Sequence, residues 1–128
     1  MKQSIFGLGV DILEISRIEL LNSQRLANKI LTKNELLEFQ IHKKPHLFLA
    51  KKFSSKEAVA KAFGVGIGAK LSFKDIEITH SHAGKPLCDV NQNKYFEITN
   101  GRVVIVHISI SDTKSLVQVH CLVELINS

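Results

Sequence analysis

The chain has 128 residues, of which 45% are hydrophobic, so residues 1–128 are expected to form one domain with its own core. The formal net charge of +5 favours an acidic partner, such as a nucleic acid, a polyanionic cofactor or an acidic protein. No segment is apolar enough to span a bilayer or act as a secretory leader, and two cysteines are too few for a disulfide framework, which predicts a cytoplasmic protein with reduced thiols.

The first predicted element is a buried strand. Residues Ile5–Val10 form an apolar run, and Gly7 and Gly9 within it indicate that another backbone approaches closely. Asp11 follows, where this strand is expected to end. Catalytic groups often occupy such positions, but an aspartate there also commonly caps the next helix, and the residues alone leave both interpretations open.

Three helices are predicted next. Apolar residues at helical spacing indicate a helix over Glu14–Asn22, and a second short helix is expected over Gln24–Ile30. Thr32 and Glu35 have the spacing of a capping box, which predicts a third helix over Thr32–Ile41. The first half of the chain is therefore expected to be mainly helical.

The longest predicted helix covers roughly His46–Phe63. Pro45 suits its first turn, and Gly64 is a natural residue to end it. Gly66 and Gly68 follow. A glycine-rich exit of this kind lets the backbone approach a ligand closely.

The second half is predicted to be mostly antiparallel sheet. Strands are expected over Asp75–His80, Pro86–Val90, Arg102–Ser111 and Leu116–Ile126. Tyr95–Thr99 is ambiguous between strand and irregular structure, and the pair Asn100–Gly101 is typical of a tight hairpin. Helices early and antiparallel strands late indicate an α+β fold, with N-terminal helices packed on a mainly antiparallel C-terminal sheet.

The segment Phe53–Gly68, FSSKEAVAKAFGVGIG, carries the most informative chemistry. Glu57 and Lys61 lie four residues apart, which places a carboxylate and an amine on one face of the helix. Together with Asp11 and the glycine-rich exit, they form a set that can hold a divalent metal against phosphate oxygens. An exposed helix ion pair between Glu57 and Lys61 is the simpler alternative.

Two further features bear on the candidate site. Lys51, Lys52 and Lys56 lie on the same predicted helix and strengthen its interpretation as a ligand site. His107 alternates with apolar residues inside a predicted strand, where a histidine is more often a hydrogen-bonded packing residue than a catalytic group.

Three motif segments occur in the chain: GLGVDILEISRIE at 7–19, FLAKKFSSKEAVAKAFGVGIG at 48–68, and GKP at 84–86 with HISISD at 107–112 behind it. Their order and separations resemble those of the holo-acyl-carrier-protein synthases, which are small phosphopantetheinyl transferases. The resemblance covers nearly the whole chain and implies the compact α+β fold of that family.

The resemblance implies transfer of the 4′-phosphopantetheine group of coenzyme A to a serine of apo acyl carrier protein, with adenosine 3′,5′-bisphosphate as the by-product. It implies that Asp11 and Glu57 hold Mg²⁺ at the pyrophosphate and that Lys61 steadies charge as the bond breaks. The serine proton passes to a carboxylate or to a water on the metal, and the residues do not choose between them. A short chain of this type is expected to serve fatty acid biosynthesis.

The resemblance also assigns residues outside this cluster. The positions expected to line the coenzyme site are Lys52, Gly64, Lys85, Pro86 and His107. Arg17 is expected to face the acyl carrier protein, whose acidic surface suits a basic chain. Family members of this short type form homotrimers with active sites at the subunit interfaces. Lys52 stands where arginine is common, and Asn91–Gly101 does not look like the helix that many relatives have there.

Two rival interpretations belong to other functional classes. One is a basic nucleic-acid-binding module without catalytic activity. The chain has one tyrosine and no tryptophan, and its lysines are interleaved with acids, so no nucleic-acid partner is expected. The other is an inactive relative that only binds the coenzyme, and the presence of Asp11, Glu57 and Lys61 argues against it.

Overall fold

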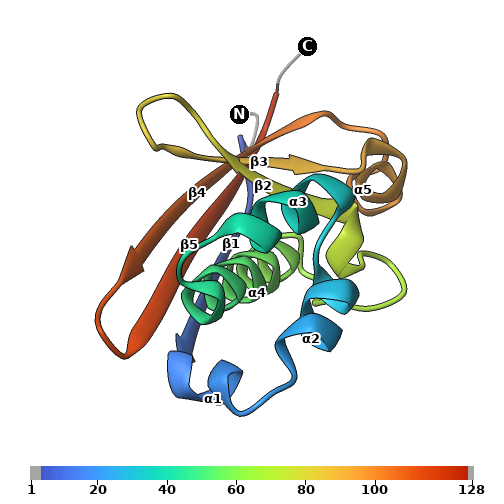
Figure 1. The fold of residues 1–128 in the computed structure, drawn as a ribbon. Coiled ribbons are helices and arrows are strands. Elements are labelled where there is room, and N and C mark those ends of the chain that lie inside the picture. Colours follow the sequence, from blue (N-terminus) through green and yellow to red (C-terminus); the bar gives the residue numbers. More distant parts are fainter. Residues whose placement is uncertain (1–3, 127–128) are drawn as a thin grey trace.

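A three-stranded sheet and one long helix form the centre of the fold. In the computed structural model, which describes residues 4–126, strands β1 (Ile5–Glu14), β5 (Leu116–Leu125) and β4 (Val104–Asp112) pair antiparallel in the order β1-β5-β4. Helix α4 (Pro45–Ala62) packs on one face of this sheet, against β1 and β5 (Figure 1). The two ends of the predicted domain lie outside the described residues.

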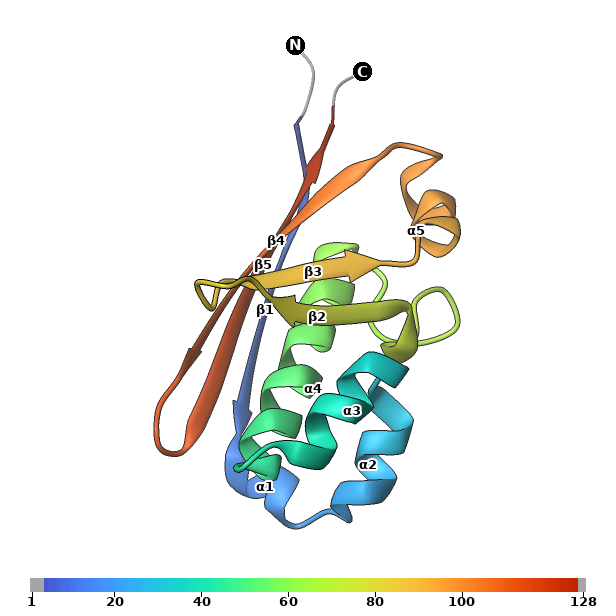
Figure 2. The ribbon, with the colours of Figure 1, turned by 45° about the horizontal axis from the view of Figure 1, so that its top comes forward.

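The remaining elements surround α4 and one end of the sheet. They are α1 (Ile15–Glu19), α2 (Ser23–Ile30), α3 (Lys33–Ile41), the 3-10 helix η1 (Phe73–Asp75), β2 (Ile76–His80), β3 (Pro86–Val90) and α5 (Gln92–Thr99). Strands β2 and β3 form a separate antiparallel hairpin that crosses the direction of the three long strands (Figure 2). This arrangement confirms the predicted α+β class. Within the described part of the chain, no helix is long and apolar enough to cross a membrane.

Three predicted helices, over residues 24–30, 32–41 and 46–63, are confirmed to within one residue at each end as α2, α3 and α4. Thr32 and Glu35 form the predicted capping box at the start of α3. Helix α4 begins at Pro45 and ends at Ala62. Gly64 follows with a φ of 79°, a left-handed conformation that glycine adopts without strain.

The strands β4 and β5 show the predicted alternation of burial. Val117, Val119, Cys121 and Val123 are buried on one face of β5, and the residues between them are more exposed. In β4 the alternation has the same period. Because β5 lies between β1 and β4, its apolar face packs directly on α4 and forms the middle of the core. Cys121 is a free thiol, as is the second cysteine of the chain.

Glycines bring β1 into direct contact with α4. A side chain at Gly7 would overlap the backbone oxygen of Ala62, and one at Gly9 would overlap that of Ala58. Two residues along a strand and four along a helix each advance about 6 to 7 Å, so alternate residues of β1 meet every fourth residue of α4. The same register brings Asp11 to α4. The close approach predicted from the sequence is confirmed, and it positions the polar cluster described below.

Replacing Gly9 with alanine should force β1 away from α4. We expect the free energy of unfolding to fall by roughly 1–3 kcal/mol, because the added methyl group meets helix backbone rather than a side chain that can move. Chemical denaturation measures this loss. Gly68→Ala is the matched control, because the space around Gly68 is open, and its stability should stay within about 0.5 kcal/mol of wild type. An equal loss in both variants would contradict the close contact.

Strand β1 is longer, and the helix after it shorter, than the sequence predicts. The predicted strand end at Asp11 is wrong, because β1 stays paired with β5 as far as Glu14. Helix α1 ends at Glu19 rather than continuing to Asn22. The side chain of Asn22 accepts a hydrogen bond from the backbone N–H of Arg25, so it caps the start of α2 instead of extending α1.

The segment between β3 and β4 is helical, which corrects a second prediction. Helix α5 covers Gln92–Thr99, where the sequence predicts strand or irregular structure over Tyr95–Thr99. Asn100 and Gly101 have positive φ angles of 55° and 76° and end this helix instead of forming a hairpin. Both kinds of turn need residues with positive φ, so the Asn–Gly pair alone does not distinguish them. Asn91 caps the start of the helix.

Candidate functional site

A polar cluster forms where Asp11 meets α4. Its Oδ1 atom accepts a hydrogen bond from Lys61 Nζ at 3.0 Å, and its Oδ2 atom accepts one from Ser54 Oγ at 2.7 Å. Lys61 Nζ also donates to the backbone oxygen of Val10 at 3.1 Å. The side chain of Asp11 is 14% exposed and that of Lys61 is 50% exposed. A largely buried carboxylate therefore shares this site with an ammonium group that reaches solvent.

Glu57 brings a second carboxylate to the cluster. Partial burial raises the pKa of Glu57 and the negative charge of Asp11 raises it further, while the charge of Lys61 opposes the shift. Among the ion pairs of residues 4–126, the one that Lys61 forms is with Asp11, so the simple helix pair between Glu57 and Lys61 is not the arrangement found. Two carboxylates thus lie near a single ammonium group.

The spacing of residues along α4 explains how the cluster is built. Ser54, Glu57 and Lys61 are separated by three and four residues, which places them on successive turns of one helix face. The structure brings Asp11, Glu57 and Lys61 together as the sequence predicts. Ser54 is not among the residues that the motif indicates, although it continues the same spacing toward the N-terminus of the helix.

The groups present suit a hard divalent cation. Carboxylate oxygens are typical ligands of Mg²⁺, which binds few protein groups and keeps several waters. Across residues 4–126 there is no group of three or more His, Cys, Asp and Glu side chains that could hold a metal. Two carboxylates are therefore what the described protein offers. Burial raises the pKa of Glu57 and the charge of Asp11 raises it further, and a cation beside both carboxylates would offset these effects.

Lys56 is next to Glu57 in the sequence but points elsewhere. Its side chain is fully buried, and Nζ lies 2.6 Å from Oε1 of Glu35. The same Nζ donates to the backbone oxygens of Ile30 at 2.6 Å and Phe73 at 3.1 Å. Lys56 therefore anchors α4 to the ends of α2 and η1 and is separate from the candidate ligand site.

Glu35 completes this buried ion pair. It is 2% exposed, and its carboxylate accepts hydrogen bonds from the backbone N–H groups of Thr32 at 2.9 Å and Ile78 at 2.8 Å. One carboxylate thus caps α3, holds β2 and neutralises the ammonium of Lys56.

The crowding of lysines on α4 does not build one ligand site, contrary to the sequence-based interpretation. Burial lowers the pKa of Lys56, and the charge of Glu35 opposes that shift.

Lys52 also points into the interior. It is 3% exposed, its Nζ donates to the backbone oxygen of Ile78 at 2.5 Å, and the same atom lies 5.1 Å from the centre of the Phe48 ring. Burial lowers the pKa of Lys52, while three nearby glutamates oppose the shift. A cavity of about 270 Å³, also bordered by His80, opens beside it. The residues that line this cavity do not include Asp11.

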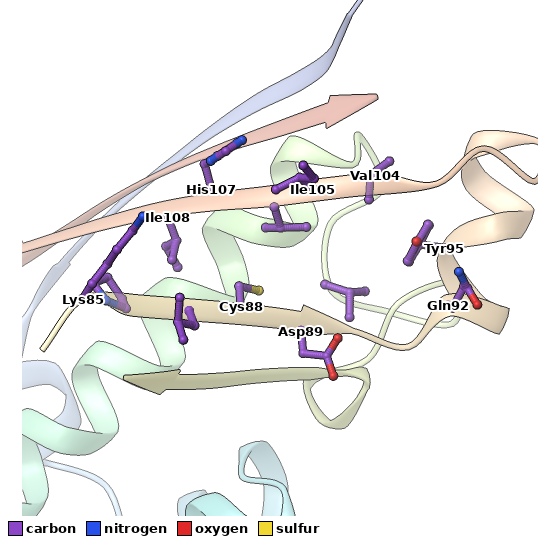
Figure 3. Close-up of a pocket in the computed structure, with 13 residues that line it drawn as sticks. Lys85, Cys88, Asp89, Gln92, Tyr95, Val104, Ile105, His107 and Ile108 are labelled. Atoms are coloured by element: carbon purple, nitrogen blue, oxygen red, sulfur yellow. The ribbon is translucent and has the colours of Figure 1, made fainter. Parts of the chain in front are cut away.

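A larger cavity of about 640 Å³ lies between β3, β4 and α5. Lys85, Pro86 and His107 line it together. Figure 3 shows Lys85 and His107 toward one end of the cavity and Tyr95 at the other. Nε2 of His107 lies 2.9 Å from Oε1 of Glu124, and both side chains are exposed, so this histidine is hydrogen-bonded without being part of the core.

The two remaining predicted site residues lie at other places. Gly64 sits one turn beyond Lys61, and its N–H donates to the Lys61 backbone oxygen at 2.9 Å. Arg17 is exposed on α1. In the described part of one chain, the predicted residues therefore fall into separate groups. Asp11 and its neighbours on α4 form one group, and the residues of the cavity beside β4 form another.

Comparisons with known proteins agree with one another. A family model described as the 4′-phosphopantetheinyl transferase superfamily matches residues 7–109. The chain is 44% identical over 112 residues to a holo-[acyl-carrier-protein] synthase of Pseudoalteromonas atlantica, covering 85% of this chain and 88% of the relative. Its fold resembles the crystal structure of the Neisseria meningitidis holo-[acyl-carrier-protein] synthase, at 41% identity and a TM-score of 0.85, over 94% of this chain and 98% of that one. It also resembles a Bacillus anthracis holo-(acyl-carrier-protein) synthase in complex with CoA (3′,5′-ADP), at 35% identity and a TM-score of 0.83, over 95% and 98%.

Proposed function

The chain belongs to the 4′-phosphopantetheinyl transferase superfamily, and on that basis we propose that it transfers 4′-phosphopantetheine from coenzyme A to a serine of apo acyl carrier protein. The products are holo carrier protein and adenosine 3′,5′-bisphosphate, and the reaction serves fatty acid biosynthesis. The observation that carries this proposal is the cluster of Asp11, Glu57 and Lys61. The comparisons favour this activity over the nucleic-acid-binding module.

Asp11 and Glu57 are the residues proposed to hold Mg²⁺. Their support is the pairing of two carboxylates with a single ammonium group, which leaves negative charge for a cation to neutralise. When bound there, Mg²⁺ would polarise the phosphorus under attack and neutralise charge on the leaving phosphate.

Lys61 is proposed to act on the charge that develops at the leaving group. Its ammonium group is half exposed, so it can turn from Asp11 toward a bound phosphate. A fixed positive charge at that place stabilises the transition state more than the ground state. In the reaction a bond forms between the serine oxygen and phosphorus while the pyrophosphate bond breaks. The serine proton passes to a carboxylate or to water.

Replacing Lys61 with alanine should lower kcat roughly 100-fold, with a smaller change in the KM for coenzyme A. The reason is that the charge is needed chiefly as the phosphate leaves. Steady-state kinetics at saturating Mg²⁺ measure both constants. Lys74→Ala removes an exposed lysine of η1 and the same net charge, and it should behave as wild type. An unchanged kcat in Lys61→Ala would contradict the role at the leaving group.

The remaining coenzyme contacts are proposed to come together in a trimer. Strand β1 exposes Leu8, Val10 and Ile12 at 69%, 47% and 61% on the sheet face away from α4. An apolar strip of this kind on a strand indicates a surface for association. We place Gly64, Lys85, Pro86 and His107 at the coenzyme, with active sites at subunit interfaces of a homotrimer. Lys52 is also assigned to the coenzyme, but its ammonium group is buried against Ile78, so it would reach the ligand only by way of the cavity that it borders. Light scattering in solution should give three times the subunit mass, and a monomer would contradict this arrangement.

The acyl carrier protein is proposed to dock near α1. Arg17 is exposed there, and the net charge of +5 would steer an acidic protein toward the enzyme. We propose that residues 1–128 work as one transferase domain in the cytoplasm. The free state of Cys88 and Cys121 is consistent with a reducing compartment.

The by-product provides a direct test of the proposed function. Coenzyme A, Mg²⁺ and apo carrier protein are incubated with the enzyme, and the nucleotides are separated by chromatography. Adenosine 3′,5′-bisphosphate should form only when all components are present, in proportion to the carrier added. Intact coenzyme A after incubation with several apo carriers and a folded enzyme would contradict the proposal.

A further inference from the structure

Ser54 is a buried residue of α4 that directly holds Asp11. Its side chain is 0% exposed, and its Oγ donates to Oδ2 of Asp11 at 2.7 Å. A serine inside a helix often bonds back to the helix backbone instead. Here the hydroxyl crosses from α4 to β1 and bonds a carboxylate that belongs to the candidate metal site.

The two hydrogen bonds of the Asp11 carboxylate differ in how easily they can be exchanged. Lys61, which holds Oδ1, is 50% exposed and carries a long flexible side chain. Ser54, which holds Oδ2, is fully buried and short, and its helix is packed against β1 at the glycine contacts. An arriving cation can therefore displace the ammonium of Lys61, whereas the hydroxyl of Ser54 stays in place.

We propose that Ser54 is a positioning residue that fixes the Asp11 carboxylate and leaves Oδ1 available to a divalent cation. This inference rests on the proposed function, in which Asp11 and Glu57 hold Mg²⁺. Hydrogen bonds from residues behind a metal ligand orient that ligand and reduce the entropy lost on binding. Ser54 thus acts through Asp11 and does not touch the substrate.

The neighbouring Ser55 provides a matched control. It is also 0% exposed on α4, but within the described part of the chain its Oγ has no hydrogen-bond partner. Ser54→Ala and Ser55→Ala therefore remove the same group from the same helix, and alanine favours helix at both positions. Only the first substitution removes a contact to Asp11.

The test is the dissociation constant for Mg²⁺, measured by calorimetry on the folded protein without coenzyme or carrier. Ser54→Ala should weaken binding about 10- to 100-fold, and Ser55→Ala should leave it unchanged. Transfer by Ser54→Ala should recover as Mg²⁺ is raised in proportion to the new dissociation constant, because the substitution affects metal binding rather than the transfer step. Equal Mg²⁺ affinity in Ser54→Ala and wild type would overturn the role of Ser54.

A third variant, Glu57→Gln, separates this inference from the proposed metal site. If Glu57→Gln loses Mg²⁺ affinity and Ser54→Ala does not, the metal assignment stands and the positioning role of Ser54 is wrong. If Glu57→Gln binds Mg²⁺ as wild type does, the metal assignment fails and the inference about Ser54 fails with it.

Discussion

Replacing Glu57 with glutamine should reduce Mg²⁺-supported transfer about 100- to 1,000-fold. Glutamine keeps the size of the side chain but removes one of the two carboxylates proposed to hold the cation, and metal stabilisation of a transferring phosphate contributes several kcal/mol. The measurement is the initial rate of holo carrier formation at saturating coenzyme A over a range of Mg²⁺ concentrations.

The same substitution should not weaken the metal-free fold at neutral pH. Burial and the charge of Asp11 raise the pKa of Glu57 in the folded protein. The free energy of unfolding therefore falls as the pH rises from the pKa that Glu57 has in the unfolded chain to its raised pKa in the folded protein. Below the first of these two values Glu57 is protonated in both states and there is no penalty. In EDTA at pH 7 the Glu57→Gln protein should melt at or above the wild-type temperature. That difference should disappear in acid.

Glu97→Gln is the control for both measurements, because Glu97 is an exposed glutamate on α5. It should change neither the transfer rate nor the melting temperature. Full activity of Glu57→Gln with wild-type Mg²⁺ dependence would remove Glu57 from the metal site. Lost activity accompanied by a lower melting temperature would give Glu57 a structural role instead.

Replacing Glu35 with glutamine should lower the free energy of unfolding by about 3–5 kcal/mol, because it leaves the buried ammonium of Lys56 without a counter-charge. Urea denaturation followed by circular dichroism measures the change. The loss should spread through the fold, since this ion pair joins α2, α3, α4, η1 and β2.

A double-mutant cycle isolates the ion pair from the other contacts of Glu35. Lys56→Met combined with Glu35→Gln should cost less than the sum of the two single changes, because each single variant leaves one unpaired buried charge and the double variant leaves none. Asp112→Asn is the exposed control. It breaks the surface pair with Lys51, at 3.2 Å, and should cost less than about 1 kcal/mol. A loss in Glu35→Gln as small as that of the control would contradict the role of the buried pair.

Local signals in the sequence were sufficient for most of the fold. The capping box at Thr32 and the proline at Pro45 mark where α3 and α4 begin. The first acts through side-chain hydrogen bonds to backbone N–H groups within one turn, and the second through its fixed φ angle. Alternating burial likewise identifies β4 and β5, because a two-residue period leaves little choice of face. These elements were predictable because the residues that determine them are close together in the chain.

The errors lie where distant contacts decide the structure. Tyr95 and Phe96 are aromatic and favour strand locally, yet they lie in helix α5, where the centre of the Tyr95 ring packs 5.8 Å from that of Phe63, a residue far away in the chain. The sequence predicts that the first strand ends at Asp11, where the apolar run Ile5–Val10 stops. The Asp11 carboxylate instead meets Ser54 on α4, so the strand continues past it.

The candidate site was predicted only in part, because some of its contacts join residues that are distant in the chain. Glu57 and Lys61 share a helix face, and that spacing is visible in the sequence. The sequence gives no sign that Lys56, the next residue to Glu57, turns inward to a glutamate on another helix. It also does not show that Lys61 pairs with Asp11 across 50 residues of chain.

Intact mass spectrometry of the carrier shows whether the cluster of Asp11 and Glu57 supports phosphopantetheine transfer. An apo acyl carrier protein is incubated with the enzyme, coenzyme A and Mg²⁺, beside one sample with EDTA and one with Glu57→Gln. The carrier should gain the mass of one phosphopantetheine group in the first sample and keep its original mass in the other two. No gain with any of several carriers would exclude the proposed transfer, and an equal gain in all three samples would exclude a role for Mg²⁺ and Glu57 in it.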